Sequence, residues 1–442
     1  MDESLEFFRL RGSEYGQLTG LNIAVHALWD AFMLMHCGVG CKHKTTSQLS
    51  THDWARSVVD REGWTEVGDA ELITGASDRI GPYLRSWYDR VEPSLIVVIS
   101  VTFLDLTGED LPFTVKENAE TVPCPVIRVS APGTHGDMFL GYQNGLVAVL
   151  RMLDWKQATR HSKEVAILGY WFDRYEGDHA GNLQQLQLLL KMLGLQLGAV
   201  AFSGTSFTKL QRIPQAEHLL VFPLLVPKIK RLQRVIKREM TVVPLPMGLR
   251  PIAVWLKTVA KATQTYSAHL EQLIQRKEEV VRKKLTAVSL YTKGKRVAIC
   301  ADLPHAVGLC AMLSDLGVEV VLVALRGQSL GNASDFQEAL LQNEVPVSED
   351  MLVLLDPSLH CLGEELGALI DLEDVDGIIA SSTELNMVEQ LPVPSLIPFG
   401  LEFGFPCKHY HTIRPAAYMG YTGILVLADR IVNAPSLRFV ER

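Results

Sequence analysis

Short runs of β-branched and other apolar residues alternate along this 442-residue chain with segments of helical periodicity. The runs are apolar throughout, which is typical of strands covered on both faces of a sheet. Such strands alternating with helices predict parallel sheets, because parallel neighbours need a long crossover connection. Seven strands are predicted: 94–101, 125–131, 164–170, 296–302, 319–325, 350–356 and 376–381.

The pattern divides into three blocks, and the chain is about three times the length of a usual domain. The fold class predicted is α/β, with three Rossmann-like domains that each contain a mainly parallel sheet flanked by helices. The polar stretch WKQATRHSK marks the first joint, and the charged segment 270–284 is predicted to be a solvated helix before the third block. The domains are 1–159, 160–292 and 293–442, with the C-terminal segment packing back on the first. Helices are predicted at 141–153, 182–193, 306–316 and 335–342.

Composition and charge exclude several classes of protein. Hydrophobic residues make up 48% of the chain, its net charge is −8, and its pI is near 5.9. A mildly acidic chain lacks the basic face that nucleic acids require, so no nucleic-acid partner is expected. The longest apolar runs are strand-length, which argues against a membrane span. The first residues lack a signal-peptide core, so a cytoplasmic protein is expected.

The seven cysteines are scattered along the chain, and none forms a CxxC pair. An odd, scattered set in a reducing compartment excludes a disulfide framework and a zinc ribbon. Cys300 and Cys310 fall in an apolar strand and the helix after it, so they are predicted to be core thiols. No chemical role is expected for Cys124 or Cys361.

The run His36-Cys37-Gly38-Val39-Gly40-Cys41 closes a long apolar stretch, 18–35. We interpret that stretch as a helix that delivers a glycine-rich turn with thiols to the end of a buried element. Cysteine sulfur holds the iron of iron–sulfur clusters, and glycines let the backbone approach closely. Two cysteines at this spacing are compatible with two ligands, with one ligand and a bystander, or with two buried thiols. A whole cluster needs further ligands from elsewhere in the chain or from a partner.

Other motifs are absent or incomplete. The sequence GVGCKHKTT is not a phosphate-binding P-loop, because His43 stands where that loop needs a glycine before Lys44 and Thr45. The segment GKRVAICADLPHAVGLCAMLSDLG has no GxGxxG, so Rossmann-type packing explains it better than a bound nucleotide. The chain contains no HExxH or GxSxG motif.

Several segments, in order along nearly the whole chain, resemble the component-1 subunits of nitrogenase and its relatives. These relatives include the protochlorophyllide and chlorophyllide reductases and the nitrogenase cofactor scaffold. The matching segments are HCGVGC, which is similar to an HGxxGC-type loop; TGEDL from Thr107, similar to an IGDDL-like turn; APGTHGDMFLGY from Ala131; GNLQQLQLLLKMLGLQL from Gly181; VVPLPMGL from Val242; GKRVAICAD from Gly294; and GFPCKHYHTIRPAAYMGYTGILVLADRIVN from Gly404.

The resemblance implies a subunit of an oxidoreductase that works with a homologous α-type subunit, as an α2β2 assembly or as a homodimer. It implies electrons from a separate ATP-hydrolysing iron protein, relayed through an iron–sulfur cluster between the subunits to a reducible substrate. Carried over by position, Cys41 matches the ligand of the HGxxGC loop. The other two family cysteines fall near Tyr15 or Gly16 and at Thr102, where this chain has none. The resemblance therefore implies a β-type subunit that gives one ligand, Cys41, to a shared [4Fe–4S] cluster, with Cys37 as an alternative ligand.

The resemblance also implies candidates near the C-terminus. His411 lies five residues after Pro406, where both nitrogenase subunits have a histidine. In the α subunit of nitrogenase a cysteine helps to hold the active cofactor; its position falls near Pro223, so this chain lacks that ligand. We interpret His409 and His411 as interface or substrate-cavity residues, with metal ligation as the alternative; Cys407 is a further candidate. Other functions left open are a cofactor-assembly scaffold, a tetrapyrrole reductase subunit and a non-catalytic stabilising subunit. Asp30 and Asp110 are read either as proton gates or as solvated caps.

Overall fold

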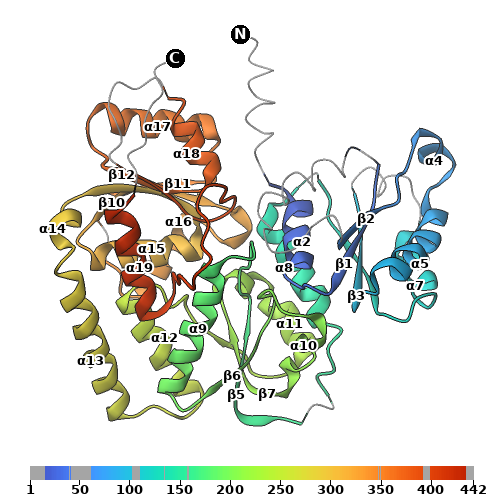
Figure 1. Ribbon diagram of the computed structural model, residues 1–442, viewed down its shortest axis with the longest axis horizontal. Coiled ribbons are helices and arrows are strands. Elements are labelled where there is room, and N and C mark those ends of the chain that lie inside the picture. Colours follow the sequence, from blue (N-terminus) through green and yellow to red (C-terminus); the bar gives the residue numbers. More distant parts are fainter. Residues whose placement is uncertain are drawn as a thin grey trace. The chain divides into compact units, whose positions relative to one another are not determined.

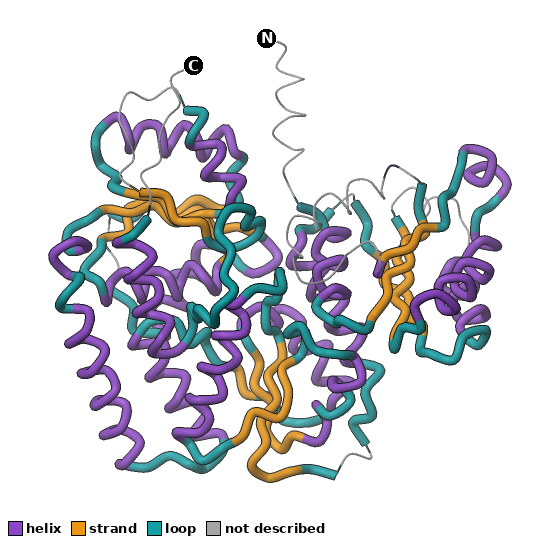
Figure 2. Tube along the Cα trace, in the orientation of Figure 1, coloured by secondary structure: helices purple, strands orange, loops and turns teal. Residues whose placement is uncertain are grey.

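The computed structural model describes residues 15–38, 40, 61–101, 110–133, 135–156, 159–346, 348, 350–391 and 399–434. Three sheets flanked by helices confirm the predicted α/β class (Figures 1 and 2). The chain divides into two compact units. One contains Tyr15–Tyr175 and Gly198–Met240, and the other contains Glu176–Leu197 and the chain from Thr241 onward. The boundaries of the three predicted domains and the packing of the C-terminal segment stay predictions.

The first sheet has the order β2-β1-β3-β4, and its neighbouring strands are parallel. One face packs on α5 and α7 through a core that includes Phe32, Leu34, Ile96 and Val98. Helices α2 and α8 pack so closely that only a glycine fits at position 20: a Cβ there would lie 1.6 Å from the Met138 carbonyl oxygen. The elements are α2 (Gln17–His26), β1 (Ala31–His36), β2 (Glu62–Trp64), α4 (Asp69–Thr74), η2 (Ser77–Arg79), α5 (Ile80–Val91), β3 (Leu95–Ser100), α7 (Leu111–Ala119), β4 (Val126–Ser130) and α8 (Met138–Leu150).

The prediction of one helix over 18–35 is wrong. Helix α2 ends at His26, and after a turn the chain continues as strand β1, all six residues of which are buried. A continuous apolar run does not distinguish a buried helix from a buried parallel strand, which is the reason for the error. The turn is held by Asp30, whose carboxylate accepts a hydrogen bond of 2.6 Å from the Phe207 amide. Cys37 therefore follows a strand and not a helix.

The second sheet has the order β6-β5-β7-β8, and β5 and β7 are parallel. The predicted strand at 164–170 and helix at 182–193 are confirmed, while the other strands of this sheet were not predicted. The charged helix predicted at 270–284 is confirmed as α13. The elements are β5 (His161–Leu168), α9 (Gly177–Met192), β6 (Gln196–Val200), α10 (Phe207–Leu210), η3 (Ile213–Gln215), β7 (Ala216–Val221), η4 (Pro223–Lys228), α11 (Ile229–Ile236), β8 (Thr241–Val242), α12 (Leu249–Ala262), α13 (Ala268–Leu285) and α14 (Ser289–Thr292).

The third sheet has the order β11-β10-β9-β12-β13 with every pair parallel. Helices α17 and α18 cover one face, where Leu362, Leu366 and Val388 join Ala298 and Ile378 in a core. The elements are β9 (Arg296–Asp302), α15 (Leu303–Asp315), β10 (Glu319–Arg326), η5 (Gln328–Leu330), α16 (Ala333–Gln342), β11 (Leu352–Leu355), α17 (Leu359–Asp371), β12 (Gly377–Ala380), α18 (Ser382–Val388), β13 (Phe399–Glu402) and α19 (Gly420–Val432).

Helix α9 belongs to the same unit as the C-terminal chain and bonds to it through buried amide side chains. The side-chain oxygen Oδ1 of Asn182 accepts hydrogen bonds from the backbone amides of Tyr418 and Met419 at 2.9 and 3.0 Å. The Gln185 side chain accepts a bond of 3.3 Å from the Thr422 amide. These bonds satisfy backbone donors at the start of α19, where the first turn of a helix has no internal partners.

Candidate functional site

The first sheet has a topological switch point between β1 and β3. In the order β2-β1-β3-β4, the chain leaves the carboxyl ends of these neighbouring strands in opposite directions. Ligands of open α/β sheets bind outside the carboxyl ends of the strands at such a point. His36 is the last residue of β1, and Cys37 and Gly38 follow it directly. The cysteine motif found in the sequence therefore begins at the expected ligand edge of this sheet.

Thr65, just beyond β2, fixes the start of that motif. Its hydroxyl accepts a hydrogen bond of 3.2 Å from the Cys37 amide and bonds to His36 Nδ1 at 2.9 Å. The Cys37 carbonyl accepts a bond of 3.0 Å from the Val67 amide. The Arg79 side chain donates to the backbone carbonyl oxygen of Thr65 at 2.8 Å, so the backbone at Thr65 is itself held in place. The backbone at Cys37 is therefore held from both sides.

The two predicted cluster ligands differ in what can be said of them. Cys41 lies outside the described residues. Cys37 is described, is not in a disulfide, and has no exposed surface. In the described part of the chain, no three side chains among His, Cys, Asp and Glu are grouped to hold a metal ion. This donor set does not fit a cluster bound by the chain alone, but it is compatible with one sulfur given to a shared cluster.

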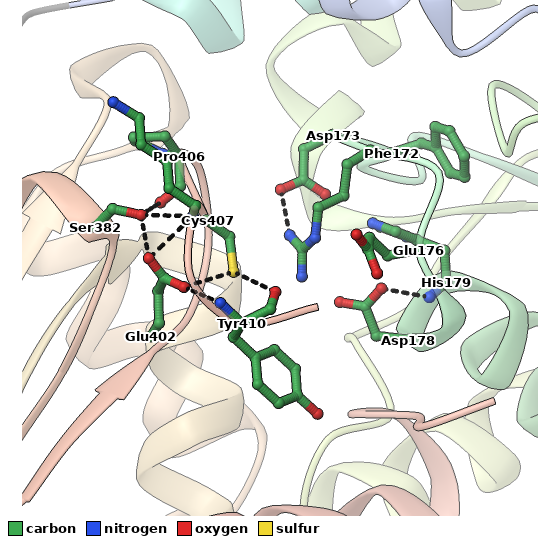
Figure 3. A network of polar contacts seen from close by, with 12 residues as sticks. Phe172, Asp173, Glu176, Asp178, His179, Ser382, Glu402, Pro406, Cys407 and Tyr410 are labelled. Atoms are coloured by element: carbon green, nitrogen blue, oxygen red, sulfur yellow. Dashed lines mark hydrogen bonds and ion pairs between the residues drawn. The ribbon is translucent and has the colours of Figure 1, made fainter. Parts of the chain in front are cut away.

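A buried carboxylate organises the segment that holds the C-terminal candidates. Glu402, the last residue of β13, accepts hydrogen bonds from the amides of Lys408, His409 and Tyr410 at 3.0, 2.9 and 2.6 Å. The Ser382 hydroxyl also donates to it (Figure 3). Burial opposes ionisation of Glu402, but these hydrogen bonds outweigh it and lower its pKa to about 2. The segment therefore folds around a permanent negative charge.

Cys407 and His409 contact the same carboxylate. The Cys407 thiol is buried, and its Sγ lies 3.3 Å from Glu402 Oε2 and 3.4 Å from the Tyr410 carbonyl oxygen, either of which can accept its single proton (Figure 3). His409 Nδ1 lies 3.1 Å from Glu402 Oε1, while 68% of the His409 side chain is exposed. Cys407 is thus bonded inside the segment, and His409 is the candidate that faces solvent.

His411 is held by a second carboxylate, that of Glu176 at the N-terminus of α9. His411 Nδ1 lies 2.9 Å from Glu176 Oε1, and its Nε2 lies 3.0 Å from the Lys408 carbonyl oxygen. Glu176 also accepts a bond of 2.7 Å from the Thr412 amide. Since both ring nitrogens are engaged, metal binding by His411 would require one of these bonds to break.

The remaining candidates are structural. Asp30 and Asp110 are caps, because Asp30 holds the Phe207 amide and Asp110 accepts a bond of 3.0 Å from the Phe113 amide at the start of α7. Cys300 and Cys310 are buried as predicted. Burial raises the pKa of both thiols, that of Cys310 to about 12. These two thiols are therefore core residues in their neutral form.

Sequence reasoning missed Thr65, Glu176, Ser382 and Glu402, which do most of the positioning. Glu402 ends a strand that was not predicted, in the segment PFGLEFG, and Glu176 lies just before a helix that was. The helix was predicted to start at 182, so no capping pattern marked Glu176 in the sequence. The pairing of either carboxylate with residues near 410 depends on tertiary contacts that no local pattern contains.

A family model for nitrogenase component 1 type oxidoreductases matches residues 17–435. The chain belongs to this family. The match includes both the edge of the first sheet that carries Cys37 and the segment organised by Glu402. Among the described helices of this family member, none is long and apolar enough to cross a membrane.

Relatives with known names are distant but similar over most of their length. The nitrogenase iron-molybdenum cofactor biosynthesis protein NifE of Rippkaea orientalis is 21% identical, with 96% of this chain and 86% of the relative covered. The nitrogenase molybdenum-iron protein beta chain of Bradyrhizobium diazoefficiens is 23% identical, with 90% and 79% covered. A solved structure of nitrogenase Cp1 at pH 6.5 has a TM-score of 0.77 at 16% identity and covers 95% of this chain and 92% of that one. The last similarity shows a shared fold.

Proposed function

We propose that this chain is a β-type subunit of a nitrogenase-like oxidoreductase. It shares a [4Fe–4S] cluster with a homologous α-type subunit, receives electrons from an ATP-hydrolysing iron protein, and relays them to a reducible substrate. One observation carries the proposal: the HCGVGC motif begins at the last residue of β1, at the switch point of the first sheet. The family match over residues 17–435 supports the same class of reaction.

Cys41 is the ligand we propose, with Cys37 as the alternative. A ligand shared between two subunits must reach the surface of its own chain, whereas Cys37 is fully buried. Cys41 lies four residues further along the sequence, after two glycines. When bound, the cluster supplies one-electron redox chemistry. The chain contributes the thiolate, the fixed backbone at Cys37, and a polar edge that includes His36 and Thr65.

A cofactor-assembly scaffold is the second candidate function. It is supported by the similarity to several proteins named for iron-molybdenum cofactor biosynthesis, each covered over most of its length. Such a subunit would hold a precursor cluster and release it, without turning over a small substrate. Cys407, His409 and His411 remain candidates for lining the cavity in either function.

The proposal is tested by anaerobic co-expression of the chain with a homologous subunit, followed by assay of iron and acid-labile sulfide. We expect Cys41→Ser to remove most of the iron of the shared cluster. Cys361→Ser, an exposed cysteine, is the matched control and should leave the iron unchanged. If neither Cys41→Ser nor Cys37→Ser lowers the iron content, the electron-relay proposal is wrong and the chain is a stabilising subunit.

The same complex separates the two candidate functions. After incubation with the iron protein and ATP, a reductase retains its iron while its reduced cluster is reoxidised by substrate. A scaffold instead loses metal to an acceptor protein. We expect retention of iron.

A further inference from the structure

Three buried polar side chains come from helix α2 and strand β2, which belong to the same compact unit and are labelled in Figure 1. Asn22 and His26 on α2 are 0% and 6% exposed, and Glu62 on β2 is 0% exposed. The two α2 residues are four apart, so their side chains are neighbours on one face of the helix. Burial of such groups is costly unless their polar atoms have partners.

The contact between His26 and Glu62 decides which nitrogen of the imidazole can accept a hydrogen bond. His26 Nε2 lies 3.0 Å from Glu62 Oε1. Burial, together with the positive charge of Arg61, holds the pKa of His26 well below its ordinary value of 6.5, so the ring is neutral and carries one proton. Since a carboxylate only accepts, that proton is on Nε2, and Nδ1 is an acceptor.

The position of His26 is also fixed through its backbone. The Arg61 side chain donates to the carbonyl oxygens of His26 and Leu28 at 3.0 and 3.4 Å, and the Tyr175 hydroxyl donates to the His26 carbonyl at 2.6 Å. The charge of Arg61 is also favourable at the C-terminal end of α2, because that end of the helix dipole is negative. With the backbone held here and Nε2 held by Glu62, the ring presents Nδ1 in one direction.

Among the residues that the structure describes, His26 Nδ1 has no hydrogen-bond partner, and neither has the side chain of Asn22. Both the oxygen and the nitrogen of the Asn22 amide are unpaired there, although Asn22 has no exposed surface. Almost all buried polar groups in folded proteins are paired, either with protein atoms or with ordered water. Unpaired atoms on two neighbouring side chains therefore point to a bound molecule that serves both.

We propose that Asn22 and His26 hold a buried water molecule between α2 and the first sheet. The water donates to His26 Nδ1 and bonds to one atom of the Asn22 amide, so one molecule satisfies both side chains. Glu62 comes three residues before Thr65, so the site lies about 10 Å along the chain direction of β2 from the residue that holds the Cys37 backbone. The inference does not depend on the proposed electron relay.

Water fits these atoms better than an ion does. Nδ1 needs a donor, while the Asn22 amide offers both a donor and an acceptor, and water can serve each of them. A fully deprotonated anion has no proton to give to Nδ1, and the Glu62 carboxylate beside His26 would repel it. A metal ion would need more ligands than this pair, and within the described ranges no three of His, Cys, Asp and Glu are grouped to hold one.

The direct test is a crystal structure of the full chain at a resolution that shows ordered water. We expect a water about 2.7–3.2 Å from His26 Nδ1 and at a similar distance from one atom of the Asn22 amide. A side chain of the protein in that position would overturn the proposal. So would the absence of any ordered atom between the two groups.

Asn22→Leu tests the same point in solution, because leucine has a similar shape but cannot bond to water. We expect the equilibrium constant for unfolding in urea to rise about tenfold, which is the effect of about one lost hydrogen bond. The number of long-lived internal waters, measured by magnetic relaxation dispersion, should fall. If the amide were truly unpaired, leucine would instead stabilise the chain, and that result would overturn the proposal.

Thr292→Val is the matched control. Thr292 is also fully buried, but its hydroxyl donates to the Leu316 carbonyl oxygen at 2.8 Å, so its partner is a protein atom. This substitution should lower stability in urea without changing the number of internal waters. An unchanged number of internal waters in Asn22→Leu, while circular dichroism shows the variant folded, would mean that Asn22 holds no water.

Discussion

Replacing Glu402 with Gln should release the segment that contains Cys407, His409 and His411. One carboxylate oxygen accepts the amides of His409 and Tyr410, and the other accepts the Lys408 amide and the Ser382 hydroxyl. A glutamine offers one oxygen, and its NH₂ group would face two donors. In either orientation two part-buried donors lose their acceptor, at a cost of about 1–3 kcal/mol each. We expect a loss of about 3 kcal/mol in local stability.

Hydrogen exchange followed by mass spectrometry measures this loss directly, because it reports local opening of the segment around 405–412. A cost of about 3 kcal/mol corresponds to exchange roughly 100-fold faster at the amides of His409 and Tyr410. Glu389→Gln, at an exposed acid of the same unit, is the control and should leave exchange unchanged. Exchange within threefold of the wild type in Glu402→Gln would refute the carboxylate-centred account.

The pH dependence of the wild type provides a second readout for Glu402. Its folded pKa of about 2 lies below the ordinary carboxyl value of 4.5, so the ionised form stabilises the fold. That contribution is present above about pH 4.5 and is lost as pH falls toward 2. The difference corresponds to at most about 3 kcal/mol, which solvent screening reduces to about 2 kcal/mol. Over this pH range the segment around 405–412 should lose protection from hydrogen exchange in the wild type, whereas its protection in Glu402→Gln should not change.

Two further substitutions test the packing of one unit and a buried charge of the other. Gly20→Ala should cost about 3 kcal/mol of unfolding free energy, because its Cβ would meet the Met138 carbonyl at 1.6 Å. Gly16→Ala, which has open space, should cost under about 1 kcal/mol, and equal melting temperatures for the two variants would contradict this. Burial raises the pKa of Asp315 from 3.8 to about 6, so the folded state disfavours the ionised form. The unfolding free energy of the wild type should therefore fall by up to about 3 kcal/mol as pH rises from 4 to 7. Asp315→Asn should remove that dependence in urea titrations at pH 4.5 and 7.5, and an unchanged dependence would mean that another group is responsible.

The sequence predicted the fold class well because the inner positions of these buried parallel strands are apolar. Strands such as β3 and β10 lie within a residue or two of their predicted bounds. Strands of two to six residues with mixed composition, such as β8 and β6, offer no comparable signal. The stretch 18–35 was misassigned because α2 and β1 are both largely apolar and buried, and only tertiary packing decides where the helix stops.

The candidate site was predicted in part. Cysteine spacing pointed to the carboxyl edge of the first sheet, and the histidines near the C-terminus lie together on one segment. The carboxylates that hold that segment could not be inferred, since Glu176 and His411 are separated by 235 residues. Local patterns describe neighbours in the chain, whereas these contacts arise only after the sheets have formed.

The bonds between α9 and the chain near 418 have a consequence for biosynthesis. Asn182 leaves the ribosome 236 residues before the amide it will bind. At about 5–20 residues per second, this delay lasts roughly 10–50 s. Throughout that time the polar groups that α9 finally buries must stay hydrated, so the nascent unit remains open until translation nears its end. Chaperone dependence of this chain should therefore be greatest for products that stop short of residue 418.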